Sequence, residues 1–336
     1  MTRRPSSPDP DGWSSSAARS SSGTVGSSRD ATGLDLYDRT ARAAAETVIA
    51  RYSTSFGFAS RLLGPRVRPH VRSIYALVRV ADEIVDGPAR EAGLTAAEES
   101  RELDALEAQT LEAIRTGFSA NLIVHAFALT ARECAIDESL VRPFFASMRT
   151  DITVSEHDAA SHDAYVYGSA EVVGLMCLQA FVNAGSATPG PADPEIVAGA
   201  RRLGAAFQNV NFLRDAGHDS GTLGRDYLGL DGSPTTRTAV LEGIDADLAA
   251  AASVIPRLPR DCRRAVTCAH DLFAELSSRL RRADASAGRV RVPNPVKAAL
   301  FARAASGAAP RSPRTTRAGD TPSSLPRSEP TPGERP

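Results

Sequence analysis

An apolar stretch of the chain, residues 74–86, carries a regular row of polar side chains that could do chemistry. The row consists of Tyr75, Arg79, Asp82 and Asp86, which follow one another at intervals of four, three and four residues. At 3.6 residues per turn, this spacing places all four on one face of an α-helix whose other faces are apolar and suited to burial. Two carboxylates and a guanidinium on a buried helix need partners that compensate their charge.

A second apolar stretch, residues 205–219, repeats the arrangement. Its polar row is Gln208, Asn211, Asp215 and Asp219, at intervals of three, four and four residues. Aspartates four residues apart repel each other on an isolated helix. One such pair is ordinary on a solvated surface, because aspartates are usually exposed. Two such pairs, each set in an apolar helix, indicate a cluster of cations shared between the helices.

Magnesium fits such a cluster. Mg²⁺ prefers oxygen ligands and commonly combines one or two carboxylates with waters and the phosphates of a substrate. Ions held between the two aspartate pairs could therefore bridge to a diphosphate and act as Lewis acids on it as it leaves. Arg79 and Arg214 would add charge-assisted hydrogen bonds to phosphate oxygens. The apolar faces of the helices would then house a hydrocarbon.

The elements that must position these rows are helical throughout the chain. Strict alternation of apolar and polar residues is rare, and Ala, Leu, Arg and Glu dominate. Thr95 with Glu98 predicts a capping box, and Asp193 before Pro194 predicts a second helix start. We expect an all-α, single-domain bundle. Its helices should span about 36–54, 67–86, 96–116, 119–134, 138–149, 161–183, 194–217, 235–254, 259–283 and 293–304.

Composition sets the limits of the folded part. Residues 1–34 are rich in serine and residues 305–336 in proline, and neither segment has enough large apolar side chains to offset the entropy of ordering. We therefore expect two disordered tails around a helical domain at 35–304. Behind Arg3 and Arg4 there is no apolar region of the kind a secretory signal needs, so the expected location is the cytoplasm.

Charge and motif content exclude several classes of protein. With 39 basic and 40 acidic residues the net charge is -1, which argues against a nucleic-acid partner held by electrostatics. No uninterrupted apolar run reaches 18 residues, so no membrane-spanning helix is expected. The four cysteines match no zinc-ligand spacing and indicate reduced thiols. No glycine motif follows a predicted strand, which leaves a Rossmann-type dinucleotide site without support.

The chain resembles the squalene/phytoene synthase family over most of residues 37–304. The motifs that carry the resemblance stand in the family's order and at its separations. They are Ser53-Thr54-Ser55-Phe56, the two polar rows with Glu83 and Arg214 among them, the segment from Tyr165 to Met176, Gly224-Arg225-Asp226-Tyr227-Leu228, and the segment from Arg289 to Pro295. Residues 168–177 and 291–297 are most similar to actinobacterial phytoene synthases.

The resemblance implies an isoprenoid-synthase fold with a central cavity, and head-to-head condensation of two prenyl diphosphates that depends on Mg²⁺, or on Mn²⁺ in its place. The implied metal ligands are Asp82, Asp86, Asn211, Asp215 and Asp219. The implied diphosphate-binding residues are Ser53, Ser55, Tyr75, Arg79, Gln208, Arg214, Tyr227 and Arg289. The four aspartates would be catalytic together with Tyr165, whose ring would steady a carbocation beside the reacting carbons. Asp151 stays outside this set, because a helix end or loop explains an aspartate there equally well.

A few positions depart from the family pattern. Tyr52 stands where the family commonly has His or Arg, and Thr54 stands where it commonly has Lys. The resemblance therefore implies less positive charge at one diphosphate site. Glu171, His218 and Gly229 are further departures, and none of them removes an implied metal ligand.

The resemblance favours a phytoene synthase that joins two C20 geranylgeranyl diphosphates in carotenoid biosynthesis without NADPH. One alternative is a squalene or dehydrosqualene synthase that uses C15 farnesyl diphosphate, and of these two only squalene formation needs NADPH. An alternative of another class is a non-catalytic scaffold or assembly protein on the same fold. Because the hydrocarbon product is insoluble in water, peripheral membrane contact is also expected.

Overall fold

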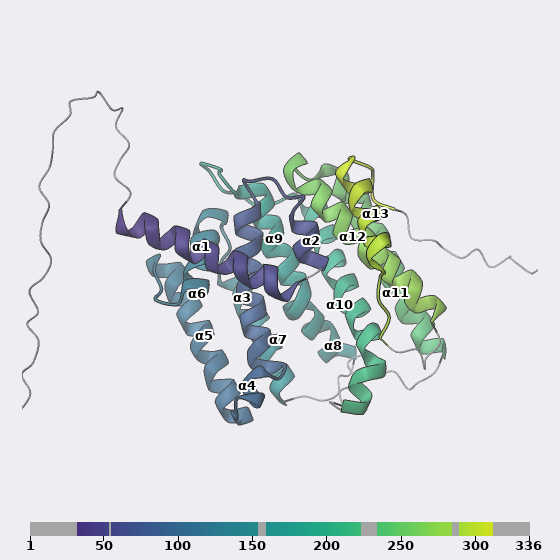
Figure 1. The fold of residues 1–336 in the computed structure, drawn as a ribbon, viewed down its shortest axis with the longest axis horizontal. Helices are drawn as coiled ribbons and strands as arrows, with labels where there is room; N and C mark the ends of the chain where they lie inside the picture. Colours follow the sequence, from purple (N-terminus) through teal and green to yellow (C-terminus); the bar gives the residue numbers. More distant parts are fainter. Residues whose placement is uncertain (1–31, 54, 154–158, 223–233, 284–288, 312–336) are drawn as a thin grey trace, which may run out of the picture.

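A computed structural model describes residues 32–53, 55–153, 159–222, 234–283 and 289–311, and every regular element in these ranges is a helix (Figure 1). The expected tails lie largely outside the described residues. The helices are α1 (Gly33–Tyr52), α2 (Ser55–Ser60), α3 (Arg68–Val85), α4 (Pro88–Glu91), α5 (Ala96–Thr116), α6 (Leu122–Cys134), α7 (Glu138–Thr153), α8 (Ala159–Val166), α9 (Val172–Asn183), α10 (Pro194–Thr222), α11 (Pro234–Val254), α12 (Arg260–Arg282) and α13 (Asn294–Ala305). A π-helical turn, Tyr167–Glu171, joins α8 to α9, and a 3₁₀ turn, Ile255–Arg257, follows α11.

Local capping explains several of the helix starts. The hydroxyl of Thr95 accepts the backbone N–H of Glu98, whose carboxylate accepts the backbone N–H of Thr95 in return, so α5 begins where the sequence predicts. Thr32 and Asp35 form the same box and start α1 at Gly33, three residues before its expected start. Caps depend on neighbours in the sequence, which is why they can be recognised without a structure.

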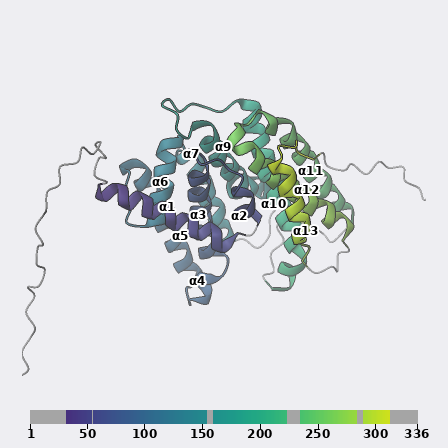
Figure 2. The same ribbon diagram turned by 45° about the horizontal axis from the view of Figure 1, so that its top comes forward.

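The bundle has two hydrophobic cores. The larger gathers side chains of α3, α5, α6, α7 and α9, with Phe127, Phe144 and Phe145 among its fully buried members. The smaller gathers α10, α11, α12 and α13 around Val210 and Leu248. Helix α10 packs against α9 and the π turn as well as against α11 and α12, and so joins the two groups (Figures 1 and 2). The two helices that carry the polar rows, α3 and α10, therefore place their apolar side chains mainly in different cores.

The π turn sits in unusually close contact with its neighbours. A Cβ atom on Gly168 would collide with the Ser147 hydroxyl and the Pro143 carbonyl of α7. A Cβ atom on Gly204 of α10 would lie 2.7 Å from the Ala170 carbonyl oxygen. Such approaches are too short for any side chain, so glycine at these positions lets α7, the π turn and α10 meet. π turns inside helices often mark functional sites.

One continuous helical stretch, Ser161–Asn183, is long and apolar enough by length and composition to cross a membrane. It comprises the end of α8, the π turn and α9. In the bundle α9 packs against α3, α6, α7 and α10, and Val172 and Met176 are fully buried. The α9 part of this stretch is therefore a core helix, which gives its apolar composition an explanation inside the protein, whereas Ser161, Asp163 and Ala164 of α8 are exposed.

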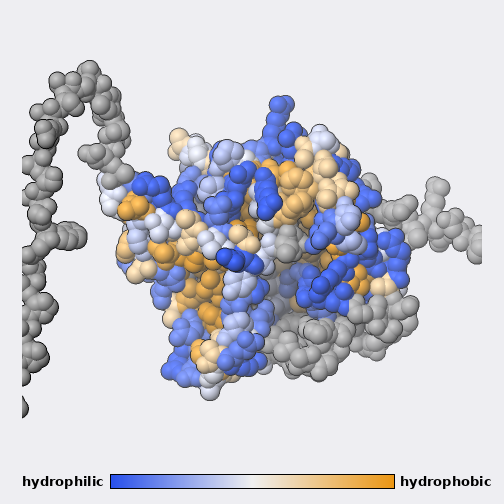
Figure 3. Space-filling view, in the orientation of Figure 1, coloured by the Kyte–Doolittle hydropathy of each residue, from blue (hydrophilic) through white to orange (hydrophobic). Residues whose placement is uncertain are grey.

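Exposed large apolar side chains cluster at both ends of α1. Leu34 and Leu36 are exposed at its start, where Phe118 lies against Tyr37 with ring centroids 5.3 Å apart. Tyr52 is exposed at its end. On the face shown in Figure 3, hydrophobic surface also gathers below α1, over α3 and α5.

Arg66, in the connection between α2 and α3, joins three parts of the bundle. Its guanidinium donates to both carboxylate oxygens of Asp261 at 2.8 and 2.9 Å, at the start of α12. It also donates to the carbonyl oxygens of Phe181 and Ala184 at 2.9 and 2.8 Å, at the end of α9. The side chain thereby satisfies carbonyl groups that the end of a helix leaves without intrahelical partners.

Replacement of Arg66 by alanine is expected to lower the free energy of unfolding by about 2 kcal/mol, because two charge-assisted bonds and two helix-end carbonyl bonds are lost together. Urea denaturation followed by circular dichroism measures this. The control is Arg101→Ala, whose exposed ion pair with Glu98 has a distance of 3.6 Å and should contribute less than about 0.5 kcal/mol. Equal losses in the two variants would contradict the structural role of Arg66.

Candidate active site

The first polar row lies along the C-terminal half of α3, as its spacing predicts. Tyr75, Arg79 and Asp82 are half-buried. Asp86 is exposed and ends the helix, and its N–H donates to the Asp82 carbonyl oxygen at 2.8 Å. The other faces of α3 enter the core through His70, Ser73, Ile74, Ala76, Leu77, Ala81 and Val85.

Ser53 brings the loop after α1 to this row. Its hydroxyl accepts the backbone N–H groups of Phe56 and Gly57 at 3.0 and 3.2 Å, and so caps the start of α2. Burial raises the pKa of Tyr75, and a hydrogen bond with Ser53 offsets this only in part. Two of the residues expected to bind diphosphate, Ser53 and Tyr75, are therefore neighbours in space.

Arg79 is held from two sides. One of its terminal nitrogens pairs with the carboxylate of Glu83, one helical turn further along α3. Its guanidinium carbon lies 4.8 Å from the centroid of the Tyr52 ring, within the range of a cation–π interaction. Its Nε atom is buried and has no hydrogen-bond partner among the described residues. Arg79 thus keeps a donor for a group that the protein itself does not supply.

Asp82 carries the most strongly perturbed carboxyl group of the row. Burial is the main cause, the Asp86 carboxylate adds to it, Arg79 offsets part of it, and the Asp151 carboxylate adds a smaller contribution, and together they raise the pKa of Asp82 to about 8. A raised pKa means that this environment disfavours a further negative charge. A divalent cation would remove that penalty, so these carboxylates fit a metal site.

Asp151 is a site residue that the sequence interpretation leaves out. Helix α7 continues to Thr153, four residues beyond its expected end at 149, so Asp151 stands inside the helix and not in a loop. Its side chain is buried and accepts the hydroxyl of Tyr165 at 2.8 and 2.9 Å. Ser147, one turn earlier, donates to the Tyr165 carbonyl oxygen at 3.2 Å. The available signal was that Ser147 and Asp151 share the face of α7 that is otherwise apolar and buried.

The second polar row lies in α10, as expected, and its carboxylate faces two cations. Arg214 donates to the oxygens of Asp215 at 3.0 and 2.6 Å, and Arg289 approaches them at 2.9 and 3.4 Å. Burial alone would raise the pKa of Asp215, but the two guanidiniums outweigh it, so the pKa is lowered. Gln208 and Asn211 are half-buried on the same helix.

Tyr165 connects the two rows. Its hydroxyl binds Asp151, which acts on the pKa of Asp82 on α3, and its ring lies 5.8 Å from the ring of Phe212 on α10. Tyr165 and Phe212 are both buried and form a small apolar cluster with Val166 and Ala205. The predicted catalytic tyrosine therefore contacts α10 through Phe212 and is linked to the α3 row through Asp151.

Three predicted site residues cannot be placed. The side chains of Ser55 and Asp219 lie outside the described part of helices α2 and α10, and Tyr227 lies wholly outside the described residues. Within the described ranges, no three acidic, histidine or cysteine side chains come together as a metal-binding group. The metal-ligand set that includes Asp219 stays a prediction.

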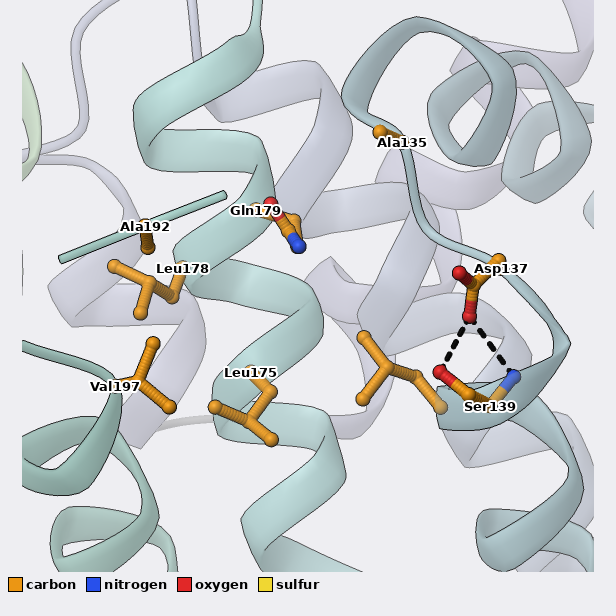
Figure 4. A pocket seen from close by; sticks show the side chains of 9 residues that line it. Ala135, Asp137, Ser139, Leu175, Leu178, Gln179, Ala192 and Val197 are labelled. Atoms are coloured by element: carbon orange, nitrogen blue, oxygen red, sulfur yellow. Dashed lines mark hydrogen bonds between the residues drawn. The ribbon is translucent and has the colours of Figure 1, made fainter. Parts of the chain in front are cut away.

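A separate pocket opens between α9, the connection from α6 to α7, and the start of α10 (Figure 4). Its volume is about 160 Å³, and Leu175, Leu178 and Val197 line its apolar part. Asp137 in its wall accepts the N–H and hydroxyl of Ser139, a bond pair that caps α7. None of the predicted site residues lines this pocket, and its polar residues Asp137, Ser139 and Gln179 already have hydrogen-bond partners, so it lies apart from the predicted site.

The sequence model of the squalene/phytoene synthase family matches residues 49–233, more than half of the chain. The chain belongs to the squalene/phytoene synthase family. The members of this family are prenyltransferases. The matched range includes both polar rows, Tyr165 and Asp151, so the family assignment covers most of the site described above.

Named relatives agree with this assignment. The chain is 26% identical over 262 residues to a 15-cis-phytoene synthase of Paracoccus sp. (strain N81106 / MBIC 01143), an alignment that covers 73% of the chain and 83% of the relative. It is 33% identical over 186 residues to phytoene synthase 2, chloroplastic, of Oryza sativa subsp. japonica, covering 55% of the chain and 44% of that protein. The expected likeness to actinobacterial enzymes stays a prediction.

Solved structures confirm the expected fold class. A crystal structure of a dehydrosqualene synthase superimposes with a TM-score of 0.65 at 22% identity, covering 81% of this chain and 98% of that one. The squalene synthase from Alicyclobacillus acidocaldarius gives a TM-score of 0.63 at 18% identity, covering 74% and 95%. At these identities the likeness shows the all-α isoprenoid-synthase fold.

The raised pKa of Asp82 predicts a pH dependence of stability in the metal-free protein. Between about pH 4 and pH 8 the folded protein keeps a proton on Asp82 that the unfolded chain has lost, so the contribution of this group to stability falls as the pH rises. Asp82→Asn removes this group and should lose less stability between pH 5 and pH 8 than the native protein, by roughly 1 kcal/mol or more. Urea unfolding with a chelator present measures both, and parallel pH profiles would contradict the raised pKa.

Proposed function

We propose that this protein is a Mg²⁺-dependent phytoene synthase, which condenses two geranylgeranyl diphosphates head to head by way of a cyclopropylcarbinyl diphosphate. The observation that carries the proposal is the pair of acidic helix faces on α3 and α10, joined through the buried pair of Tyr165 and Asp151. The relatives named above are phytoene synthases, which favours the C20 substrate and a role in carotenoid biosynthesis.

The donor set suits the metal. Asp82, Asp86, Asn211 and Asp215, with Asp219 outside the described side chains, offer the oxygen ligands that Mg²⁺ prefers, and Mn²⁺ would be accepted on the same chemistry. Bound Mg²⁺ would supply positive charge to the leaving diphosphate.

The residues of the chain have separate tasks in this proposal. Arg79 offers the unused Nε donor to a phosphate oxygen, and Arg214 and Arg289 offer charge-assisted bonds beside Asp215. Tyr165, fixed by its bond to Asp151, presents a π face that attracts a carbocation. The apolar core around the tyrosine excludes water, which would otherwise quench such a cation.

Two alternatives have different support. Farnesyl diphosphate as the substrate would make the protein a squalene or dehydrosqualene synthase, and the structural likeness to such proteins carries only the fold. A non-catalytic scaffold is the second alternative. Buried carboxylates such as Asp82 lower the stability of the fold, and a scaffold would gain no function from them in return, which counts against this alternative. The proposal further places the protein in the cytoplasm. Peripheral membrane contact is part of the proposal because phytoene is insoluble in water. The proposed reaction does not use NADPH.

Product analysis tests the substrate. The purified protein is incubated with Mg²⁺ and either geranylgeranyl or farnesyl diphosphate, with and without NADPH, and the hydrocarbon is identified by mass spectrometry. We expect a C40 product from geranylgeranyl diphosphate that does not depend on NADPH. A C30 product alone would refute the phytoene assignment, and no product from either substrate would favour the scaffold.

Single aspartate variants test the metal assignment. Asp82→Ala and Asp215→Ala should each lower kcat by about 10³-fold or more. Each variant removes a proposed ligand of Mg²⁺, whose positive charge would stabilise the leaving diphosphate. Circular dichroism checks that the fold persists. The control is Asp163→Ala on α8, whose side chain is 91% exposed and which should stay within about twofold of native activity. Near-native turnover in both site variants would be inconsistent with the assignment.

A further inference from the structure

The end of α1 meets α3 through one aromatic side chain. Tyr52, the last residue of α1, lies with its ring against the guanidinium of Arg79, at 4.8 Å from guanidinium carbon to ring centroid. The electron-rich face of the ring attracts the cation at this distance. The contact joins two helices that both border the site, and it involves a position where the sequence departs from its family.

Arg79 contacts two groups from different helices, the Glu83 carboxylate on its own helix and the Tyr52 ring at the end of α1. Glu83 lies one turn away on the same helix and already pairs with one terminal nitrogen. An arginine beside a carboxylate tends to form a two-pronged bond with it, using Nε as well. In this site the Nε atom is instead buried and unbonded among the described residues. The Tyr52 ring contacts the same guanidinium and can fix its orientation, because stacking on an aromatic face leaves the in-plane N–H donors free.

We propose that Tyr52 is a positioning residue for diphosphate binding: its ring fixes the Arg79 guanidinium, already paired with Glu83 through a terminal nitrogen, in an orientation that leaves Nε for a phosphate oxygen. The ring thus takes over the task of a second basic side chain by fixing the direction of an existing one. The inference rests on the proposed function only in taking the anion to be the diphosphate of the substrate.

A role in stability does not explain the ring. Tyr52 is 53% exposed and belongs to none of the hydrophobic clusters of the described residues. Its replacement therefore leaves the core intact. Phe118 offers a matched control, because it is also a 53% exposed aromatic residue and it packs against Tyr37, near the end of α1 opposite to Tyr52.

The test is a titration of the full chain with inorganic pyrophosphate and Mg²⁺ by isothermal calorimetry, paired with steady-state kinetics. Tyr52→Leu, which lacks a π face, should bind pyrophosphate about 3–10-fold more weakly and raise KM by a similar factor, with kcat within about twofold. Tyr52→Phe keeps the ring and should stay within about twofold in both measurements. Phe118→Leu should match the native protein.

A double-mutant cycle separates positioning from a general effect of the ring. In an Arg79→Gln background, Tyr52→Leu should weaken pyrophosphate binding by less than about twofold, because there is no cation left to hold. The proposal is overturned if Tyr52→Leu binds as the native protein does, if Tyr52→Phe is as weak as Tyr52→Leu, or if the effect persists without the Arg79 cation. Should this pattern hold while neither prenyl diphosphate gives a product, the proposed function fails and the positioning role stands.

Discussion

Carboxylates that share a poorly hydrated space must bind protons or cations, and the two halves of this site answer that requirement differently. On α3 the Asp82 carboxyl is held towards its protonated form by burial and by Asp86. On α10 the Asp215 carboxylate stays charged because Arg214 and Arg289 lie on it. In the proposed function, divalent ions and a diphosphate would replace both arrangements, one by loss of a proton and the other by movement of arginine side chains towards phosphate oxygens.

Features that depend on sequence neighbours could be predicted from the sequence. The helix α5 follows from the Thr95 and Glu98 box, and the faces of α3 and α10 follow from the spacing of their polar residues. The ion pair of Arg79 with Glu83 is likewise local, since the two residues are one turn apart. In each case the interacting residues are only a few positions apart in the sequence, so the interaction can be predicted without knowledge of the fold.

Features that depend on distant partners could not be predicted. Arg289 reaches Asp215 across 74 positions of the chain, and no pattern within either segment announces that contact. Phe56 of α2 packs against Phe207 and Phe273 of other helices, and no pattern near Phe56 in the sequence predicts those contacts. The bond of Asp151 with Tyr165 could not be predicted for the same reason, since the two residues belong to different helices, α7 and α8.

The π turn between α8 and α9 gives a single continuous helix two independent registers. A residue in an α-helix turns about 100° from the one before it, so the extra residue accommodated in a π turn offsets everything that precedes it by that angle. The side chains of α9 can therefore pack into the core around Met176, while Tyr165 packs into the separate cluster with Phe212 and lies where the proposed function needs it. Sequence changes in one half need not be matched in the other, which lets the wall of the site and the core of the bundle evolve separately.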